Sequence, residues 1–437
     1  MKQIVRFLYV LCFLLLNNSN LFAYVGYDCK VDGIYYKRIS TDEFEVAPEV
    51  VGWYNPSEEN ANAYKGNVTI PSSVTYNGKT FQVTGIGNYA FYACSMTSVT
   101  IPSSIKTIGE IAFGCQSLSS FNYLGDLSEW CKIKFADDRR SNPIYKTHHL
   151  FIKGKEIKDL VIPEDVNNIS TYAFIGCQGI TSVTIPNNVT SIGDGAFYEC
   201  SNIKSVKLSN NLSSIGNSAF YGCTSLTSIT IPSGMTQIGS NAFHTCTSLT
   251  SIKLPHSLKS IFNHAFKNCT SLKSISIPSG SSLSQGAFQG CTSLKTIEIP
   301  GEIPYDLCKD CSSLEKVIIR SSRDIGNSAF SGTTDLSSIY IYSKEPPYIQ
   351  PQTFDDYHFV WTDLYVPKGT KDEYKKNSQW KFVSIIEFDT TGIEAVNGEE
   401  TNESVRYNLD GHKILEPKSG INIIKMNNGT TYKVIVK

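Results

Sequence analysis

The sequence has no excess of charge of one sign. Its 39 Lys and Arg residues are matched by 40 Asp and Glu residues, the formal net charge is −1, and only 18% of the chain is charged. Nucleic acids and anionic membranes bind proteins through clustered positive charge. The near balance of charges gives no support to either partner, and we expect no nucleic-acid ligand.

Long hydrophobic runs are missing beyond the start of the chain. Residues Met1–Arg6 include two basic side chains, Phe7–Leu16 is apolar, and Ala23 is a small residue shortly after this run. This order is typical of a secretory signal peptide, expected at residues 1–23. A membrane-spanning helix needs about 20 apolar residues, more than this run has. We expect a secreted or cell-surface protein, associated with the outer membrane and without a transmembrane segment.

Sequence motifs of catalysis and metal binding are also missing. There is no P-loop, no Gly-x-Gly-x-x-Gly after a strand and no nucleophile elbow. The seven histidines form no metal-binding motif. His148 and His149 have no Glu at the spacing of a zinc protease, and His244, His256 and His264 lie near one another but at variable, outward positions of the repeat. We therefore expect no metal, no cofactor and no enzymatic activity.

What the sequence does contain is a repeat. The block Ile-Gly-x-x-Ala-Phe-x-x-Cys, with Phe in place of Gly in the last copy, recurs every 23 residues in four consecutive copies: Ile192–Cys200, Ile215–Cys223, Ile238–Cys246 and Ile261–Cys269. A fixed period of 20 to 29 residues is typical of a solenoid, in which each unit buries its apolar face against its neighbours.

One complete unit runs from Leu226 to Cys246. Its first part reads Leu-x-x-Ile-x-Ile, an alternation that predicts a short strand with one face inward, and Pro232 ends that strand. Its last part, Ala-Phe-x-x-Cys, has the spacing of one helical turn. The unit predicts a right-handed coil, mainly β with short helical turns, with one parallel sheet along its inner face.

These residues resemble the leucine-rich repeat L-x-x-L-x-L-x-x-N, and specifically its BspA-like variant, which has Ile-Pro after the strand and Ala-Phe-x-x-Cys in its second half. The resemblance extends from about Val68 to Phe388. It implies a surface or secreted protein that adheres to host matrix proteins or to other cells.

Two columns of core side chains follow from the repeat. Stacked coils should place one Phe of each unit above the next, as a buried column formed by Phe197, Phe220, Phe243 and Phe266. Most of the 13 cysteines share another register. Equivalent Cβ atoms in stacked coils lie about 4.8 Å apart, whereas a disulfide needs about 3.8 Å. We therefore expect buried free thiols, and we interpret Cys308 and Cys311 as core residues rather than a redox pair.

Changes in the pattern predict the domain boundaries. The expected segments are an N-terminal cap at 24–66, repeats at 67–333 with an insertion at 122–158, a C-terminal capping region at 334–388, a linker at 389–404 and a small all-β tail at 405–437. The insertion is expected to project as a loop or hairpin, and Asn77-Gly78 predicts the turn of another hairpin. The tail resembles type IX secretion sorting domains, and a plain β cap is the alternative.

The outward positions of the repeat strands are mostly Ser and Thr, with five interspersed lysines: Lys204, Lys207, Lys253, Lys273 and Lys295. One interpretation is that small residues simply suit a solvated face. The other is a broad, weakly basic binding face, a use that solenoids often make of a repeated surface. Its ligand would be a protein, including host extracellular matrix, or a glycan.

Two classes of function are compatible with this sequence. The first is an interaction protein that mediates adhesion, and the alternative is a polysaccharide-binding or glycan-processing surface component. Exposed aromatic residues that stack on sugars are absent from the outward strand positions of the regular coils. The sequence therefore favours the interaction protein.

Overall fold

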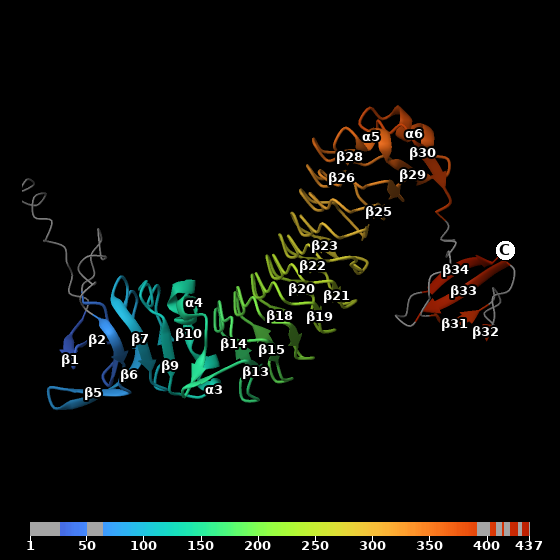
Figure 1. The fold of residues 1–437 in the computed structure, drawn as a ribbon. Coiled ribbons are helices and arrows are strands. Elements are labelled where there is room, and N and C mark those ends of the chain that lie inside the picture. Colours follow the sequence, from blue (N-terminus) through green and yellow to red (C-terminus); the bar gives the residue numbers. More distant parts are fainter. Residues whose placement is uncertain are drawn as a thin grey trace, which may run out of the picture.

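The computed structural model describes residues 27–49 and 64–390, together with the strand residues 403–407, 413–414, 420–426 and 431–436. These residues wind into a long, bent solenoid followed by a small separate sheet (Figure 1). The predicted fold class is confirmed. The predicted signal peptide at 1–23 and most of the predicted linker lie outside the described residues.

Each regular coil contributes a three-residue strand and a two-residue strand to two separate rows. The first row consists of β13 (Asp159–Val161), β15 (Ser182–Thr184), β17 (Ser205–Lys207), β19 (Ser228–Thr230) and β21 (Ser251–Lys253). The second row consists of β14 (Asn168–Ile169), β16 (Ser191–Ile192), β18 (Ser214–Ile215), β20 (Gln237–Ile238), β22 (Ser260–Ile261) and β23 (Ser282–Leu283). Pairing is parallel, and equivalent residues of successive units face one another, as with Val183 and Val206.

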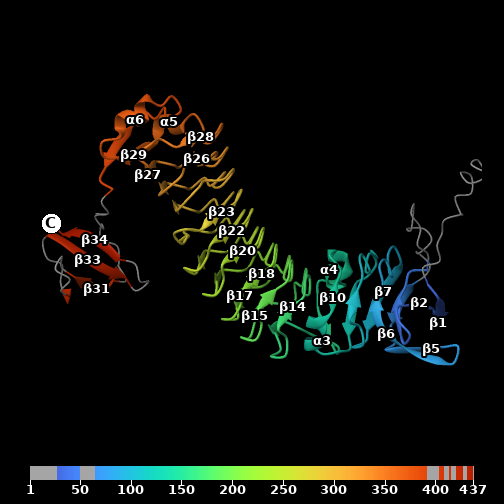
Figure 2. The ribbon, with the colours of Figure 1, turned by 180° about the vertical axis from the view of Figure 1, so that it is seen from behind.

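The two rows correct the prediction of one sheet on the inner face. Figures 1 and 2 show β15, β17, β19 and β21 along the outer side of the bend, whereas β18, β20 and β22 follow its inner side. Both rows consist of parallel strands, and the pairing is interrupted between β17 and β19 in one row and between β18 and β20 in the other. Paired strands lie about 4.8 Å apart in either row. The apolar pattern of a single coil therefore does not determine which row lies inside the bend.

The Ala-Phe-x-x-Cys segment also differs from its prediction, because it forms two tight turns instead of a helical turn. Gly195 and Glu199 have left-handed backbone conformations, each with φ of 56°. The N–H of Cys200 donates to the carbonyl of Phe197 within the coil, at 3.2 Å, and the N–H of Phe197 donates to the carbonyl of Ala219 in the next coil, at 2.8 Å. The segment is thus a third hydrogen-bonded ladder between coils.

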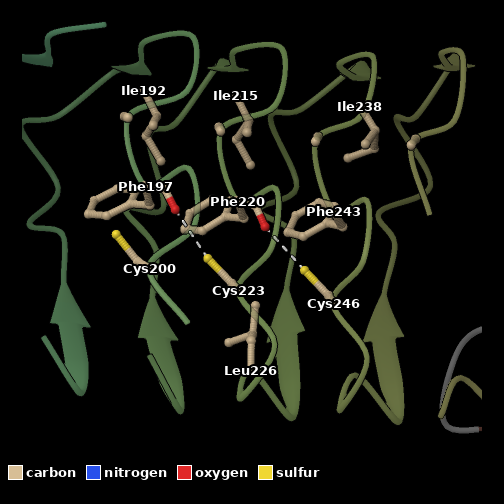
Figure 3. Close-up of a cluster of buried hydrophobic side chains, with 14 of the residues drawn as sticks. Ile192, Phe197, Cys200, Ile215, Phe220, Cys223, Leu226, Ile238, Phe243 and Cys246 are labelled. Carbon is tan, nitrogen blue, oxygen red and sulfur yellow. Dashed lines mark hydrogen bonds between the residues drawn. The ribbon is translucent and has the colours of Figure 1, made fainter. Parts of the chain in front are cut away.

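A column of phenylalanine rings fills the core beside this ladder (Figure 3). The rings of the four predicted residues stack on one another and on Phe174 and Phe288, with centroids 5.2–5.6 Å apart and ring planes within 9° of parallel. All six are fully buried. Each ring therefore packs against the coils on both sides.

The cysteines lie beside the rings as buried free thiols, as predicted. The Sγ of Cys223 donates to the carbonyl of Phe197 in the preceding coil, at 3.3 Å, and Cys246 makes the same contact with Phe220, at 3.2 Å (Figure 3). Burial raises the pKa of Cys246 to about 12. Cys308 and Cys311 are also fully buried, which supports their interpretation as core residues.

The insertion at 122–158 does not project from the solenoid, so that prediction is wrong. Its strands extend existing sheets: β10 (Lys134–Phe135) pairs with β8 (Thr107–Ile108), and β11 (Phe151–Ile152) pairs with β9 (Ser120–Tyr123). β11 also forms a hairpin with β12 (Lys155–Glu156). The insertion is therefore an enlarged coil.

Two helices of the insertion, α3 (Leu127–Lys132) and α4 (Ile144–Thr147), supply its core residues. Trp130 is fully buried, and its indole N–H donates to the carbonyl of Ala173 in the next coil, at 2.9 Å. The Asn142 side chain donates to the carbonyl of Tyr172 at 2.9 Å. These contacts explain why the segment packs against the solenoid.

The N-terminal end is covered by β1 (Cys29–Val31), β2 (Ile34–Arg38) and β3 (Glu43–Val46), which continue into the sheet of β6 (Lys79–Ile86). The predicted hairpin is confirmed: β5 (Ser73–Tyr76) pairs with β6 around Asn77 and Gly78, whose φ values are 52° and 77°. Two parallel strands beside this end are β4 (Lys65–Thr69) and β7 (Ser95–Ile101).

At the other end the long-strand row continues through β24 (Thr296–Ile299), β25 (Lys316–Ile319), β27 (Ser338–Ile341), β29 (Asp363–Pro367) and β30 (Ile385–Phe388). Two short helices, α5 (His358–Trp361) and α6 (Lys371–Lys376), lie at this end (Figure 1). The tail strands β31 (Glu403–Tyr407), β32 (Lys413–Ile414), β33 (Gly420–Met426) and β34 (Thr431–Val436) form one antiparallel sheet. No helix within the described ranges is long and apolar enough to cross a membrane.

Candidate binding surface

The outward side of the long-strand row, from β15 to β30, is a continuous surface that we call the strand face. Its outward side chains align from coil to coil because the strands pair in register: Ser182 faces Ser205, and Thr184 faces Lys207. On β19 and β21, Thr230 faces Lys253 in the same way. The regular coils therefore present rows of hydroxyl groups interrupted by lysines.

The five predicted lysines all lie on the strand face and are exposed. Lys207 and Lys253 share one register, two coils apart. Lys204, Lys273 and Lys295 share the position just before the strand, where the N–H of Lys295 donates to the carbonyl of Lys273 at 3.3 Å. The structure thus brings the lysines together in two rows, with Lys204 three coils away from Lys273.

Ion pairs limit the basic character of this surface toward its C-terminal end. The ammonium group of Lys295 lies 2.7 Å from a carboxylate oxygen of Glu315, and this hydrogen bond raises the pKa of Lys295. Arg320 pairs with Glu298, also at 2.7 Å. Lys204, Lys207, Lys253 and Lys273, by contrast, have no ion pair within the described part of the chain, and they form the uncompensated part of the basic surface.

The strand face ends in a group of aromatic and basic side chains that we call the aromatic cluster. Its members are Tyr340, Tyr342, Tyr365, Phe388, Lys316 and Arg320. The rings of Tyr340 and Tyr365 stack at 4.2 Å, and the Lys316 ammonium lies 4.2 Å from the Tyr340 ring centroid. The guanidinium of Arg320 lies 4.1 Å from the ring of Tyr342. This cluster was not predicted from the sequence.

The histidines are not gathered into a site. Among the residues that the structure describes, no group of three or more His, Cys, Asp or Glu side chains is arranged to hold a metal ion. His149 contacts Glu156 within the insertion, and His244 stacks on Tyr221 with ring centroids 4.7 Å apart. Burial and the nearby charge of Lys267 lower the pKa of His244 to about 4.

Comparison with known families identifies the repeat. Residues 66–139, 147–250 and 236–361 match the family described as the BspA type leucine rich repeat region, in six copies. The chain belongs to the BspA-type leucine-rich repeat family. The family assignment made from the repeat residues is thereby confirmed.

Solved structures of bacterial leucine-rich repeat proteins are also similar to this BspA-type chain. A leucine rich cell surface protein from Faecalibacterium prausnitzii is 23% identical, with a TM-score of 0.39, over 74% of this chain and 96% of that one. A leucine-rich repeat protein from Bacteroides ovatus is 24% identical, with a TM-score of 0.39, over 78% and 100%. One from Eubacterium ventriosum is 21% identical, with a TM-score of 0.45, over 71% and 82%. No curated protein matches the chain.

Proposed function

We propose that this protein is a secreted or cell-surface interaction protein that binds a macromolecular partner through the strand face and mediates adhesion to host matrix proteins or to cells. The observation that carries the proposal is the continuity of the strand face, which runs exposed along successive coils and ends in the aromatic cluster. The BspA-type family supports a role in interactions at a surface. In this proposal residues 1–23 direct export, and the tail at 405–437 is a sorting domain.

The uncompensated lysines give the strand face its proposed preference for acidic partners. From Lys204 to Lys273 the basic surface extends over three coil steps, about 14 Å at about 4.8 Å per step. Lys295 extends it by one further step, to about 20 Å, although Glu315 compensates its charge. A sulfated glycan or an acidic stretch of a matrix protein would contact several of these charges at once.

The aromatic cluster supplies contacts of a different kind. Tyrosine and arginine are enriched among the residues that contribute most of the binding energy in protein interfaces. Tyr340, Tyr365 and Arg320 lie together at the end of the strand face, where a protein partner steered by the lysines would reach them. The two regions are thus proposed to act together, with the lysines accelerating encounter and the cluster slowing dissociation.

The test is a binding screen of the mature protein against matrix proteins, sulfated glycans and cells, at low and at physiological salt. Binding should weaken as salt rises, because exposed charges are screened over about 8 Å at physiological ionic strength. The triple variant K207S/K253S/K273S leaves the strand pattern intact and should bind at least about tenfold more weakly at low salt.

A matched control is K155S/K259S/K375S, which removes three exposed lysines that lie off the strand face. It should bind like the parent protein. Equal binding by the parent and by K207S/K253S/K273S at low salt would exclude the lysine rows as the site.

A further inference from the structure

The inner row of short strands carries a depression that is separate from the strand face. It has a volume of about 600 Å³ and crosses the coils of β16, β18 and β20. We call it the inner groove. The side chains that matter for its chemistry are those of Thr171, Asp194, Ser214, Asn217, Gln237 and Phe262.

The floor of the inner groove is formed by Gly193, Gly216 and Gly239, one directly after each of these strands. A Cβ atom added at Gly216 would lie 2.4 Å from a carboxylate oxygen of Asp194 and 2.6 Å from its backbone nitrogen. Close stacking of the coils therefore requires glycine here. The result is a trough, without side chains on its floor, that is about three coils long.

Phe262 occupies the same register in the next coil and interrupts the row of glycines. Its side chain is 37% exposed, whereas the core phenylalanines of the regular coils are fully buried. The ring lines the end of the inner groove instead of packing into the core. An exposed aromatic ring at the end of a polar trough offers a flat apolar surface for a ligand.

The walls of the inner groove combine hydrogen-bond donors and acceptors. One carboxylate oxygen of Asp194 accepts from the N–H of Asn217 at 2.7 Å, and the amide oxygen of Asn217 accepts from the N–H of Ser240 at 3.0 Å. The amide nitrogen of Asn217, the hydroxyl of Ser214 and the amide of Gln237 have no hydrogen-bond partner within the described ranges. These groups are available to a ligand that both donates and accepts hydrogen bonds.

We propose that the inner groove binds a neutral oligosaccharide, with the ring of Phe262 stacking on the apolar face of one sugar unit. The lining contains no cationic side chain and one carboxylate, which disfavours an anionic ligand. It contains one exposed apolar ring and no row of apolar pockets, which disfavours an amphipathic peptide. The strands β16 and β18 already pair with each other, which leaves no open edge between them for strand addition.

The position of the inner groove supports this assignment. It follows the inner side of the bend, where β18, β20 and β22 lie (Figures 1 and 2). Solenoids commonly use the extended concave surface that their curvature creates. A linear chain of sugars could follow the trough across several coils. This site is distinct from the strand face, and the proposal does not rest on the lysine rows.

The experiment is calorimetric titration of the full chain with uncharged linear oligosaccharides: cellohexaose, laminarihexaose, maltohexaose and xylohexaose. At least one should bind. The variant F262G restores the residue used in the preceding coils and should lower the affinity about tenfold, which corresponds to a loss of about 1.4 kcal/mol of binding free energy. F262Y keeps the ring and should retain the affinity, and Q237A should weaken it.

Two controls separate this site from others. Y305A removes an exposed aromatic residue that is not part of the groove lining, and K207S/K253S/K273S alters only the strand face. Both should bind the oligosaccharide like the parent protein. The proposal is overturned if no neutral oligosaccharide binds at millimolar concentration, or if F262G and Q237A, shown to be folded by circular dichroism, bind as tightly as the parent.

Discussion

Phe220 shows at the residue scale how one side chain links three coils. Its ring lies between those of Phe197 and Phe243, with centroids 5.2 and 5.5 Å away. Its carbonyl accepts the thiol of Cys246, and its N–H donates to the carbonyl of Ala242 at 2.9 Å. The stability of the solenoid therefore depends on contacts that each residue makes on both sides.

Truncation of this ring should be costly. We expect F220A to lower the free energy of unfolding by about 3–5 kcal/mol, because a large buried ring is removed and the rigid column cannot close the cavity. Urea denaturation followed by circular dichroism measures the change. Y305A, which truncates an exposed ring, is the control. A loss below about 1 kcal/mol would contradict the role given to the column.

The cysteines provide a second prediction at this scale. Burial raises the pKa of Cys177 and of Cys246 to about 12, so almost no thiolate exists at neutral pH. The folded protein should resist alkylation of these thiols. After denaturation without reductant all the repeat cysteines should become labelled, which mass spectrometry can count. Disulfides linking one coil to the next would disprove the column of free thiols.

Much of the core could be predicted because the repeat fixes the register of each residue. Phe220 and Cys223 recur at a constant spacing of 23 residues in four consecutive units, so their alignment follows from stacking alone. Phe262 was not singled out, because its importance depends on the glycines of three other coils. Only the folded coils show that its ring lies at the end of a trough.

At the scale of elements, two histidines predict a response of stability to pH: His244 in a turn of the repeat and His358 in α5. In α5 the Nδ1 of His358 accepts the N–H of Asp355 at 2.9 Å, and its Nε2 lies 2.9 Å from the carbonyl of Thr333. Burial lowers the pKa of His358, and it lowers that of His244 to about 4. The side chain of His244 is therefore neutral in the folded protein near pH 6, and burial favours the neutral form of His358 as well.

The unfolded chain takes up these protons first, because histidine in an unfolded chain has a pKa of about 6.5. The neutral histidines therefore contribute fully to the free energy of unfolding above about pH 6.5, and this contribution is lost as the pH falls toward 4. The urea midpoint should therefore decrease between pH 7.5 and pH 4.5. The decrease should be smaller in H244Y, which extends the stack of Tyr198 and Tyr221. An equal decrease in both proteins would contradict this assignment.

The elements differ in how well the sequence predicts them. The prediction of a hairpin at Asn77-Gly78 is correct because these turn residues determine a local backbone geometry. The prediction that the insertion projects from the solenoid is wrong because its packing depends on contacts with the next coil, such as that of Trp130 with Ala173. The Ala-Phe-x-x-Cys segment was predicted as helical because two consecutive tight turns give the same spacing of buried residues.

At the scale of the whole molecule, the repeat determines the solenoid but not the direction in which it bends. Two parallel rows of strands and a ladder of turns run along it, and the apolar pattern of one coil is the same whichever row lies on the inner side. The lysine rows follow directly from the strand register and could be predicted. The aromatic cluster could not be predicted, because its aromatic members lie on or directly after β27, β29 and β30, beyond the regular repeat. The inner groove could not be predicted, because it depends on the single coil in which Phe262 replaces glycine.

Lysine footprinting of the bound complex tests the central claim, which is that partners bind on the strand face. The protein would be acetylated with and without the partner found in the binding screen, and the reactivity of each lysine measured by mass spectrometry. We expect protection of Lys204, Lys207, Lys253 and Lys273, with Lys259 and Lys375 unchanged. Protection of Lys259 or Lys375 while the strand-face lysines stay fully reactive would contradict it.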